Sequence, residues 1–205
     1  MGRVGVSVVE GPGFPAGFFE QDALVVARAL LGAELSSGGV VVRITETEAY
    51  REDDSACHAF TGRTKRNAAL FGPPAHWYVY LCYGIHRLIN VVTGPEGHAA
   101  AVLIRSAEPV RGLATIRRRR RGLNGPTLLN GPGKLGQGLG AKLEHTGDSV
   151  VDGALHVRPG EAPSAVLIGP RIGIDYAQPE DRDAPWRFAS AGTKWVGHRR
   201  RLRAE

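Results

Sequence analysis

The sequence has few cysteines and no long apolar run. Its 205 residues include only Cys57 and Cys82, so at most one disulfide can form and a disulfide-stapled small domain is excluded. The longest strongly apolar run, residues 99–104, is far shorter than the roughly 18 residues that a membrane-spanning helix needs. The first thirty residues lack a basic segment followed by an apolar stretch. We therefore expect a compact protein of the reducing cytoplasm that does not cross a membrane.

Lysine is scarce as well, and arginine supplies most of the positive charge. The chain holds 22 arginines and 4 lysines, with a net charge of +6 and a pI near 9.7. The arginines cluster in residues 117–121 and again at Arg199, Arg200, Arg201 and Arg203. Guanidinium groups bind phosphates bidentately and displace counterions, so such runs favour a polyanionic partner, nucleic acid first. Solvated surface or contact with an acidic membrane would also fit the runs.

Turn residues are scattered along the chain and no internal repeat is present, which predicts a single domain over residues 1–205. A helix is expected over residues 22–31, capped by Asp22 and ended by Gly32. A hairpin should join residues 33–35 to 40–50, and strands at 77–83, 87–92 and 99–105 should form an antiparallel meander. Further helices are expected over residues 64–71 and 110–121, and further short strands over 150–157, 165–168 and 171–174. The order of elements predicts a mixed α+β fold.

An acidic strand carries the first candidate chemistry. Alternation along residues 45–50 places Glu46, Glu48 and Tyr50 on one face. Two neighbouring carboxylates repel unless arginine or lysine pairs with them, and paired carboxylates are a recurring device for hydrolysing glycosidic bonds. The alternative is a solvated edge strand with ordinary salt bridges.

An aromatic segment, residues 77–84, is the second candidate for a functional site. Alternation places Tyr78 and Tyr80 on one face, and Gly84 puts Tyr83 at a turn, where it can project outward. An exposed aromatic at a hairpin tip is a candidate wedge for a nucleic-acid duplex. The alternative is a half-buried sheet in which the tyrosine hydroxyls find ordinary partners.

Two other patterns are weaker. The histidines and cysteines of residues 57–86 do not fall at zinc-ligand spacings, so no metal site is predicted. Residues 131–135 resemble a phosphate loop but have Leu128 and Leu135 where that loop needs Gly and Ser or Thr, which excludes a nucleotide triphosphatase. Lys134 and the glycines around it would still suit a DNA phosphate.

Taken together, the motifs resemble the alkyladenine (3-methyladenine) DNA glycosylase family in order and in spacing. The motifs are Leu30-Leu31-Gly32, Glu46-Thr47-Glu48-Ala49-Tyr50, His58, Gly62-Arg63-Thr64-x-Arg66-Asn67, Tyr78-Val79-Tyr80-x-x-Tyr83-Gly84, Asn90, Val102-Leu103-Ile104-Arg105 and Gly131-Pro132-x-Lys134-Leu135. The resemblance covers about residues 14–196 and leaves a basic C-terminal tail, residues 197–205. It implies one domain around a curved antiparallel sheet with flanking helices, like the C-terminal domain of formyltransferases. It also implies a bacterial-type minimal catalytic domain that needs no cofactor or metal.

The resemblance also implies a role for each matched residue. Glu48 stands where the family has its catalytic glutamate, and Tyr83 where it has the residue inserted into DNA. The implied base pocket consists of Tyr50, His58, Tyr80, Asn90 and Arg105. Contacts to the DNA backbone are expected from Arg63, Arg66 and Lys134.

The expected activity is that of a monofunctional glycosylase of base excision repair. Alkylated or deaminated purines (3-methyladenine, 7-methylguanine, hypoxanthine or ethenoadenine) would be flipped out of duplex DNA, and a water activated by Glu48 would cleave the N-glycosidic bond. We expect a monomer bound to double-stranded DNA, with no membrane partner, in the cytoplasm and associated with the nucleoid. Two alternatives remain open: a non-catalytic binder of distorted DNA, and a hydrolase of small glycosides or nucleosides. Residues 85–86, 93–98 and 117–121 depart from the family pattern, and no role is assigned to the arginine run.

Overall fold

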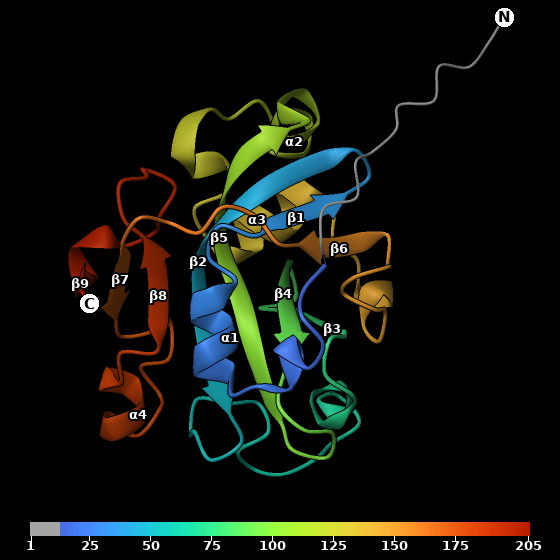
Figure 1. Cartoon of the computed structure of the whole chain (residues 1–205), viewed down its shortest axis with the longest axis vertical. Coiled ribbons are helices and arrows are strands. Elements are labelled where there is room, and N and C mark those ends of the chain that lie inside the picture. Colours follow the sequence, from blue (N-terminus) through green and yellow to red (C-terminus); the bar gives the residue numbers. More distant parts are fainter. Residues whose placement is uncertain (1–12) are drawn as a thin grey trace, which may run out of the picture.

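The computed structural model describes residues 13–205, which form one open antiparallel sheet with helices packed around it (Figure 1). Residues 1–12 lie outside the described residues. They belong to the first thirty residues, for which no secretion signal is predicted. The strand order is β3-β4-β5-β2-β8-β7-β9, with β1 paired to β2 and β6 paired to β1. The strands are β1 (Glu34–Ser37), β2 (Val40–Arg51), β3 (Trp77–Cys82), β4 (His86–Val92), β5 (Ala100–Arg111), β6 (Leu155–Arg158), β7 (Val166–Gly169), β8 (Arg187–Ser190) and β9 (Arg203–Ala204). The α+β fold expected from the sequence is confirmed.

The helices are short and lie around the sheet. In Figure 1, α1 lies in front of the lower part of β2, with β5 beside it, α2 lies at the top, and α4 lies at the lower left. The α-helices are α1 (Ala23–Ala29), α2 (Leu113–Arg119), α3 (Pro132–Leu139) and α4 (Pro179–Asp183). The 3₁₀ helices are η1 (Phe18–Glu20), η2 (Ala68–Phe71), η3 (Gly125–Leu128), η4 (Leu143–His145) and η5 (Arg199–Arg201). No helix in residues 13–205 has the length and apolar character to cross a membrane.

Helix α1 begins and ends where local chemistry predicts. The Asp22 side chain accepts a 2.8 Å hydrogen bond from the Leu24 N–H, which caps the first turn. Gly32 follows the helix at φ +89°, and a Cβ there would lie 2.0 Å from the Glu161 carbonyl oxygen, so no larger residue fits. The Thr47 hydroxyl donates to the Ala27 carbonyl at 2.7 Å and ties the helix to β2.

The central pair β2 and β5 contains a double irregularity beside the acidic strand. Ile44 pairs with Ala107, Glu46 with Ser106 and Thr47 with Ile104, so Thr45 and Arg105 are each an extra residue in the ladder. Bulges re-aim side chains and are frequent next to active sites. Here the bulge lets Arg105 reach both glutamates of β2.

Four predicted elements are wrong in whole or in part. The strand expected over residues 150–157 forms only as β6 (Leu155–Arg158), because the residues before it turn. The helix expected over residues 64–71 is reduced to the 3₁₀ turn η2. The helix expected over residues 110–121 begins only at Leu113, because pairing with β2 carries β5 on to Arg111 and Gly112, at φ +82°, then turns the chain. The strand expected over residues 171–174 is irregular, since Gly173 lies at φ +80°.

Two features of the sheet were not predicted from the sequence, namely strand β8 and the pairing of β9 with β7. β8 pairs with the centre of β2, so the acidic strand is not an edge strand. β9 places the end of the basic C-terminal segment on the outer edge of the sheet (Figure 1).

Candidate functional site

A pocket of about 410 Å³ opens where the end of β2, the loop after it, the β3–β4 hairpin and the segment after β7 converge. Most of its lining is apolar or aromatic, and a few polar groups face it, as is usual for small-molecule and base-binding sites. It brings together seven of the residues predicted for the site. They are Tyr50, His58, Arg66, Tyr80, Tyr83, Asn90 and Arg105.

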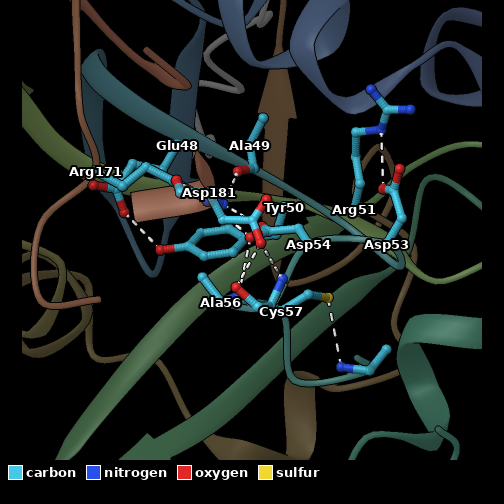
Figure 2. Close-up of polar contacts among 12 residues, drawn as sticks. Glu48, Ala49, Tyr50, Arg51, Asp53, Asp54, Ala56, Cys57, Arg171 and Asp181 are labelled. Atoms are coloured by element: carbon cyan, nitrogen blue, oxygen red, sulfur yellow. Dashed lines mark hydrogen bonds and ion pairs between the residues drawn. The ribbon is translucent and has the colours of Figure 1, made fainter. Parts of the chain in front are cut away.

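Glu48 lies fully buried behind the wall of this pocket. Its Oε2 accepts hydrogen bonds from the Tyr50 hydroxyl at 2.9 Å and from Arg105 Nη1 at 3.0 Å (Figure 2 shows the Tyr50 contact). Its Oε1 accepts a 2.8 Å hydrogen bond from the Ile172 N–H. All three donor residues line the pocket, so the carboxylate is fixed in place directly beside it.

Glu46 is buried beside Glu48 and is held by four donors. Its Oε1 accepts from Arg105 Nε at 3.1 Å and from Arg187 Nη1 at 3.0 Å. Its Oε2 accepts from the Ser106 hydroxyl at 2.8 Å and from the Gly197 N–H at 2.7 Å. Burial by itself raises the pKa of Glu46, but Arg105 and the other donors outweigh it and leave the pKa below its usual value.

The two glutamates and two arginines form a compact charge-balanced cluster. Arg105 bridges Glu46 and Glu48, and its pKa is raised because the attraction of the two carboxylates exceeds the desolvation that burial imposes. Arg187 is fully buried and donates to the Pro170 and Gly197 carbonyls as well as to Glu46. The expectation that Glu46 and Glu48 share a face is confirmed, and arginine partners remove the repulsion between them.

An aromatic group forms one side of the pocket. The Tyr78 and Tyr80 rings stack with centroids 5.4 Å apart, which confirms that they share a face. The His58 ring lies 4.5 Å from the Tyr80 ring, and its Nδ1 is 3.0 Å from the Tyr78 hydroxyl. Burial raises the pKa of Tyr78 to about 12 and also raises that of Tyr80, so both phenols stay neutral. Part of the His58 side chain is exposed, but the partial desolvation of its ring and then nearby Arg66 lower its pKa, which favours a neutral imidazole.

Asn90 lies at the inner end of the aromatic side. It is 5% exposed, and its amide nitrogen donates to the carbonyl of Tyr78, its cross-strand neighbour, at 3.0 Å. That bond holds the side chain against the pocket wall.

Tyr83 stands at the tip of the β3–β4 hairpin and is 87% exposed. Tyr83 and Gly84 have φ values of +50° and +71°, and the Ile85 N–H donates to the Cys82 carbonyl at 3.1 Å, as in a type I′ turn. A tyrosine in the left-handed region is strained, and Gly84 after it is the residue that this turn prefers. The tight turn projects the Tyr83 ring beside the pocket mouth.

The three residues predicted to contact the DNA backbone lie in different settings. Arg66 lines the pocket and donates to the Leu81 carbonyl at 3.4 Å. Lys134 lies in the first turn of α3 and donates to Asn130 Oδ1 at 2.8 Å. The Arg63 guanidinium lies 5.7 Å from the centroid of the Phe71 ring and does not line the pocket. The structure therefore does not bring the three into one cluster.

A second buried pair, which was not predicted from the sequence, supports the site. Arg171 donates to both carboxylate oxygens of Asp54 and to the Ala49 carbonyl. Its guanidinium lies 4.7 Å from the Tyr50 ring centroid and 4.9 Å from that of Trp186 (Figure 2 shows Arg171, Asp54 and Tyr50). Arg171 thus braces Tyr50 and fixes the segment whose next N–H binds Glu48.

Tyr176 was not predicted either. It is 70% exposed, lines the pocket from the segment after β7, and donates its hydroxyl to the Ala56 carbonyl at 3.1 Å. In residues 13–205 no group of three or more His, Cys, Asp or Glu side chains is arranged to hold a metal ion.

Known proteins are similar to this chain over most of its length. The family model for methylpurine-DNA glycosylase matches residues 17–194. A relative from Arabidopsis thaliana named "DNA-3-methyladenine glycosylase" is 52% identical over 186 residues, which cover 89% of this chain and 73% of the relative. Two bacterial relatives have names that include the words 3-methyladenine DNA glycosylase. The Nitrosococcus oceani protein is 55% identical over 92% of this chain and 94% of its own length, and the Carboxydothermus hydrogenoformans protein is 43% identical over 89% and 97%.

Proposed function

Because this chain belongs to the methylpurine-DNA glycosylase family and is an N-glycosyl hydrolase that acts on DNA, we propose that Glu48 activates the water that releases a flipped, damaged purine. The substrates are alkylated or deaminated purines of the 3-methyladenine, 7-methylguanine, hypoxanthine and ethenoadenine class. The observation that carries the proposal is the fixed Glu48 carboxylate beside a pocket lined by aromatic rings. The protein acts as a monomer on double-stranded DNA in the cytoplasm, at the nucleoid.

The hydrogen bonds of Glu48 leave a defined place for the water. Each carboxylate oxygen can accept two hydrogen bonds. Oε2 accepts two, from Tyr50 and Arg105, whereas Oε1 accepts one, from the Ile172 N–H. Oε1 is therefore the atom that takes the proton of the attacking water.

The reaction then balances without a cofactor. The water oxygen forms a bond to C1′, its proton passes to Glu48 Oε1, and the bond from C1′ to the purine nitrogen breaks. The bonding electrons leave with the base, so a purine that carries a positive charge before cleavage leaves as a neutral molecule, and the proton on Glu48 returns to solvent. A neutral purine such as hypoxanthine leaves with a negative charge and takes up one proton by way of solvent water, which balances the proton that Glu48 releases. Glu48 also stabilises the positive charge that develops on the sugar.

The pocket suits an extruded, electron-poor purine. Tyr50 and Tyr80 face it with ring surfaces on which such a base stacks. Neutral His58 and neutral phenols place no further cation against a positively charged base. We assign Asn90, whose amide is held by the Tyr78 carbonyl, to steric conflict with the exocyclic amine of guanine. Arg105 holds Glu48 in its orientation.

We assign Tyr83 to the space that the flipped nucleotide leaves in the duplex. Tyr83→Ala should weaken binding to a lesion-bearing duplex by about tenfold or more, since stacking on an aromatic side chain is worth about 1–3 kcal/mol per base. The rate on a single-stranded substrate should stay near that of the wild type. The matched control is Ile85→Ala, which removes the other exposed apolar side chain of the same hairpin. Equal losses on single-stranded and duplex substrates would contradict the assignment.

His58 should make stability fall in weak acid. Its pKa in the folded protein lies below its ordinary value of 6.5, so the unfolded chain binds the proton first as pH drops. The contribution of neutral His58 is complete above pH 6.5 and declines below it, down to the lower folded pKa. Urea unfolding between pH 7.5 and 5 should therefore show a steeper loss for the wild type than for His58→Asn. Parallel curves of unfolding free energy against pH for the two proteins would refute this role of His58.

Substrate form separates the proposal from its two alternatives. Release of free base should be measured from the same damaged purine in a duplex, in a single strand and in a nucleoside, at matched concentrations. We expect release from the duplex and little or none from the nucleoside. A non-catalytic binder would retain the duplex without release, and a nucleoside hydrolase would prefer the nucleoside.

A further inference from the structure

The positive charge of the chain is concentrated in one segment next to the pocket. Residues 109–143 contain no aspartate or glutamate. They contain eight cationic residues, which are Arg111, the five arginines 117–121, Lys134 and Lys142. Since the whole chain carries +6, the rest of the sequence carries −2. The basic character of this protein is therefore a property of the segment that forms α2, η3 and α3.

The arginines of α2 fall into two groups with different surroundings. Arg119 donates to the Gly138 carbonyl at 3.0 Å, and Arg120 donates to the Leu128 carbonyl at 3.0 Å and to the Gln137 side chain. These two residues attach α2 to α3 and η3. Arg117, Arg118 and Arg121, which we call the α2 arginine surface, are exposed instead. No acidic side chain of residues 13–205 pairs with any of them.

Helix α3 connects this surface to the catalytic pocket. At its first turn, Pro132 lines the pocket and Gly133 lies so close to His86 that a Cβ there would be 2.8 Å from the imidazole. His86 begins β4, directly after the hairpin that carries Tyr83. At its last turn, Gln137 and Gly138 bind Arg120 and Arg119. Eight residues of helix span about 12 Å, so the α2 arginine surface begins about one α3 length from the pocket edge.

We propose that the α2 arginine surface binds the phosphate backbone of the lesion-bearing duplex, three or more nucleotides to one side of the flipped base. The inference rests on the proposed function for the position of the flipped base. Successive phosphates of one strand are about 3.4 Å apart along the axis, so about 12 Å corresponds to between three and four nucleotides. Guanidinium groups bind phosphates more strongly than they bind neutral partners. In residues 13–205 no acidic side chain pairs with these three arginines, so their charge is available to phosphates. The contact adds affinity and extends the binding site in one direction only.

The experiment compares two variants that lose the same charge. Arg117→Ala/Arg118→Ala/Arg121→Ala removes the surface, and Arg200→Ala/Arg201→Ala/Arg203→Ala removes three arginines from the C-terminal segment around β9. Fluorescence anisotropy should give the dissociation constant for a hypoxanthine-bearing duplex between 50 and 400 mM salt. The maximal single-turnover excision rate is measured on the same duplex. A third series shortens the duplex to two base pairs on one side of the lesion at a time.

Each phosphate contact contributes about 0.9 to the slope of log K against log salt. The α2 variant should therefore lose about 2 to 3 from this slope and weaken binding by about tenfold or more at 0.1 M salt, with a maximal excision rate within about twofold of the wild type. The β9 variant should lose clearly less slope and less affinity than the α2 variant. Shortening one flank should weaken binding by the wild type but not by the α2 variant, and shortening the other flank should affect both equally.

Three results would overturn the inference. Equal loss of slope in both variants would show an effect of net charge. An unchanged slope in the α2 variant would show that the arginines make no contact with the phosphates. Tighter binding of the wild-type protein to anionic phospholipid vesicles than to duplex would identify a different partner. Failure of the proposed function is separable. If the wild type excises nothing but the binding and flank results hold, the proposed function fails and the backbone contact stands.

Discussion

Glu48→Gln is expected to lower the maximal single-turnover rate of base release by about 10³-fold or more while leaving binding to lesion-bearing duplex within a few fold of the wild type. General-base catalysis contributes about 10²–10⁴ to a rate, and the lost negative charge removes stabilisation of the cationic sugar as well. Glutamine keeps the shape of the side chain but cannot take a proton from water. The measurement is a rapid-quench time course with enzyme in excess over a labelled duplex.

Glu48→Asp is the matched control. It keeps the charge but shortens the side chain, so the carboxylate withdraws from the Ile172 N–H, which holds Oε1 at 2.8 Å in the wild type. We expect a rate between those of the wild type and Glu48→Gln. Wild-type excision by Glu48→Gln, with folding verified by thermal unfolding, would contradict the assigned role.

Glu46→Gln is expected to destabilise the protein more than Tyr83→Ala or His58→Asn does. The substitution leaves Arg187 fully buried without a direct carboxylate partner and removes the charge that pairs with Arg105. It also puts an amide NH2 in place of one of two oxygens that each accept two hydrogen bonds, so two buried donors lose their acceptor. Breaking a buried ion pair by removing one partner costs about 3–5 kcal/mol. Urea unfolding should show a loss in this range. At a temperature where the variant stays folded, excision should also be slower, because Arg105 loses its charged partner Glu46 and holds Glu48 less firmly.

A double-mutant cycle with Arg187→Gln tests this explanation. If the cost comes from an unpaired buried charge, the double variant should be less destabilised than the sum of the two single variants. The lowered pKa of Glu46 adds a pH dependence: its contribution is complete well above pH 4.5 and is lost as pH falls through the lower folded pKa. An unfolding free energy for Glu46→Gln within about 1 kcal/mol of the wild type would contradict the account.

Local patterns predicted much of the sheet and part of the site. Capping by Asp22, the shared face of Tyr78 and Tyr80, and the turn at Tyr83 and Gly84 each depend on residues close together in the chain. These features could be predicted because local backbone geometry alone determines capping, side-chain alternation and turn type. The positions of His58 and Asn90 at the pocket came from resemblance to a family, since nothing in their own neighbourhoods marks them.

The contacts that hold the acidic cluster could not be predicted because they join distant segments. Asp54 and Arg171 are 117 residues apart, and Gly197 donates to Glu46 across 151 residues. The Ile172 N–H is free to bind Glu48 only because residues 171–174 do not form the predicted strand, in which ladder pairing would have used backbone groups. The bulge at Arg105 likewise depends on how β2 and β5 pair, which side-chain alternation does not reveal.

Cleavage of the N-glycosidic bond of damaged purines in duplex DNA is the activity that we propose for this site. The direct measurement is single-turnover formation of abasic sites by the wild type in two labelled duplexes, one with hypoxanthine and one with a methylated purine, read by alkaline cleavage. We expect abasic sites in at least one duplex and none in an undamaged control. Saturating, lesion-selective binding without abasic sites in either duplex would contradict the proposal and identify a non-catalytic binder of distorted DNA.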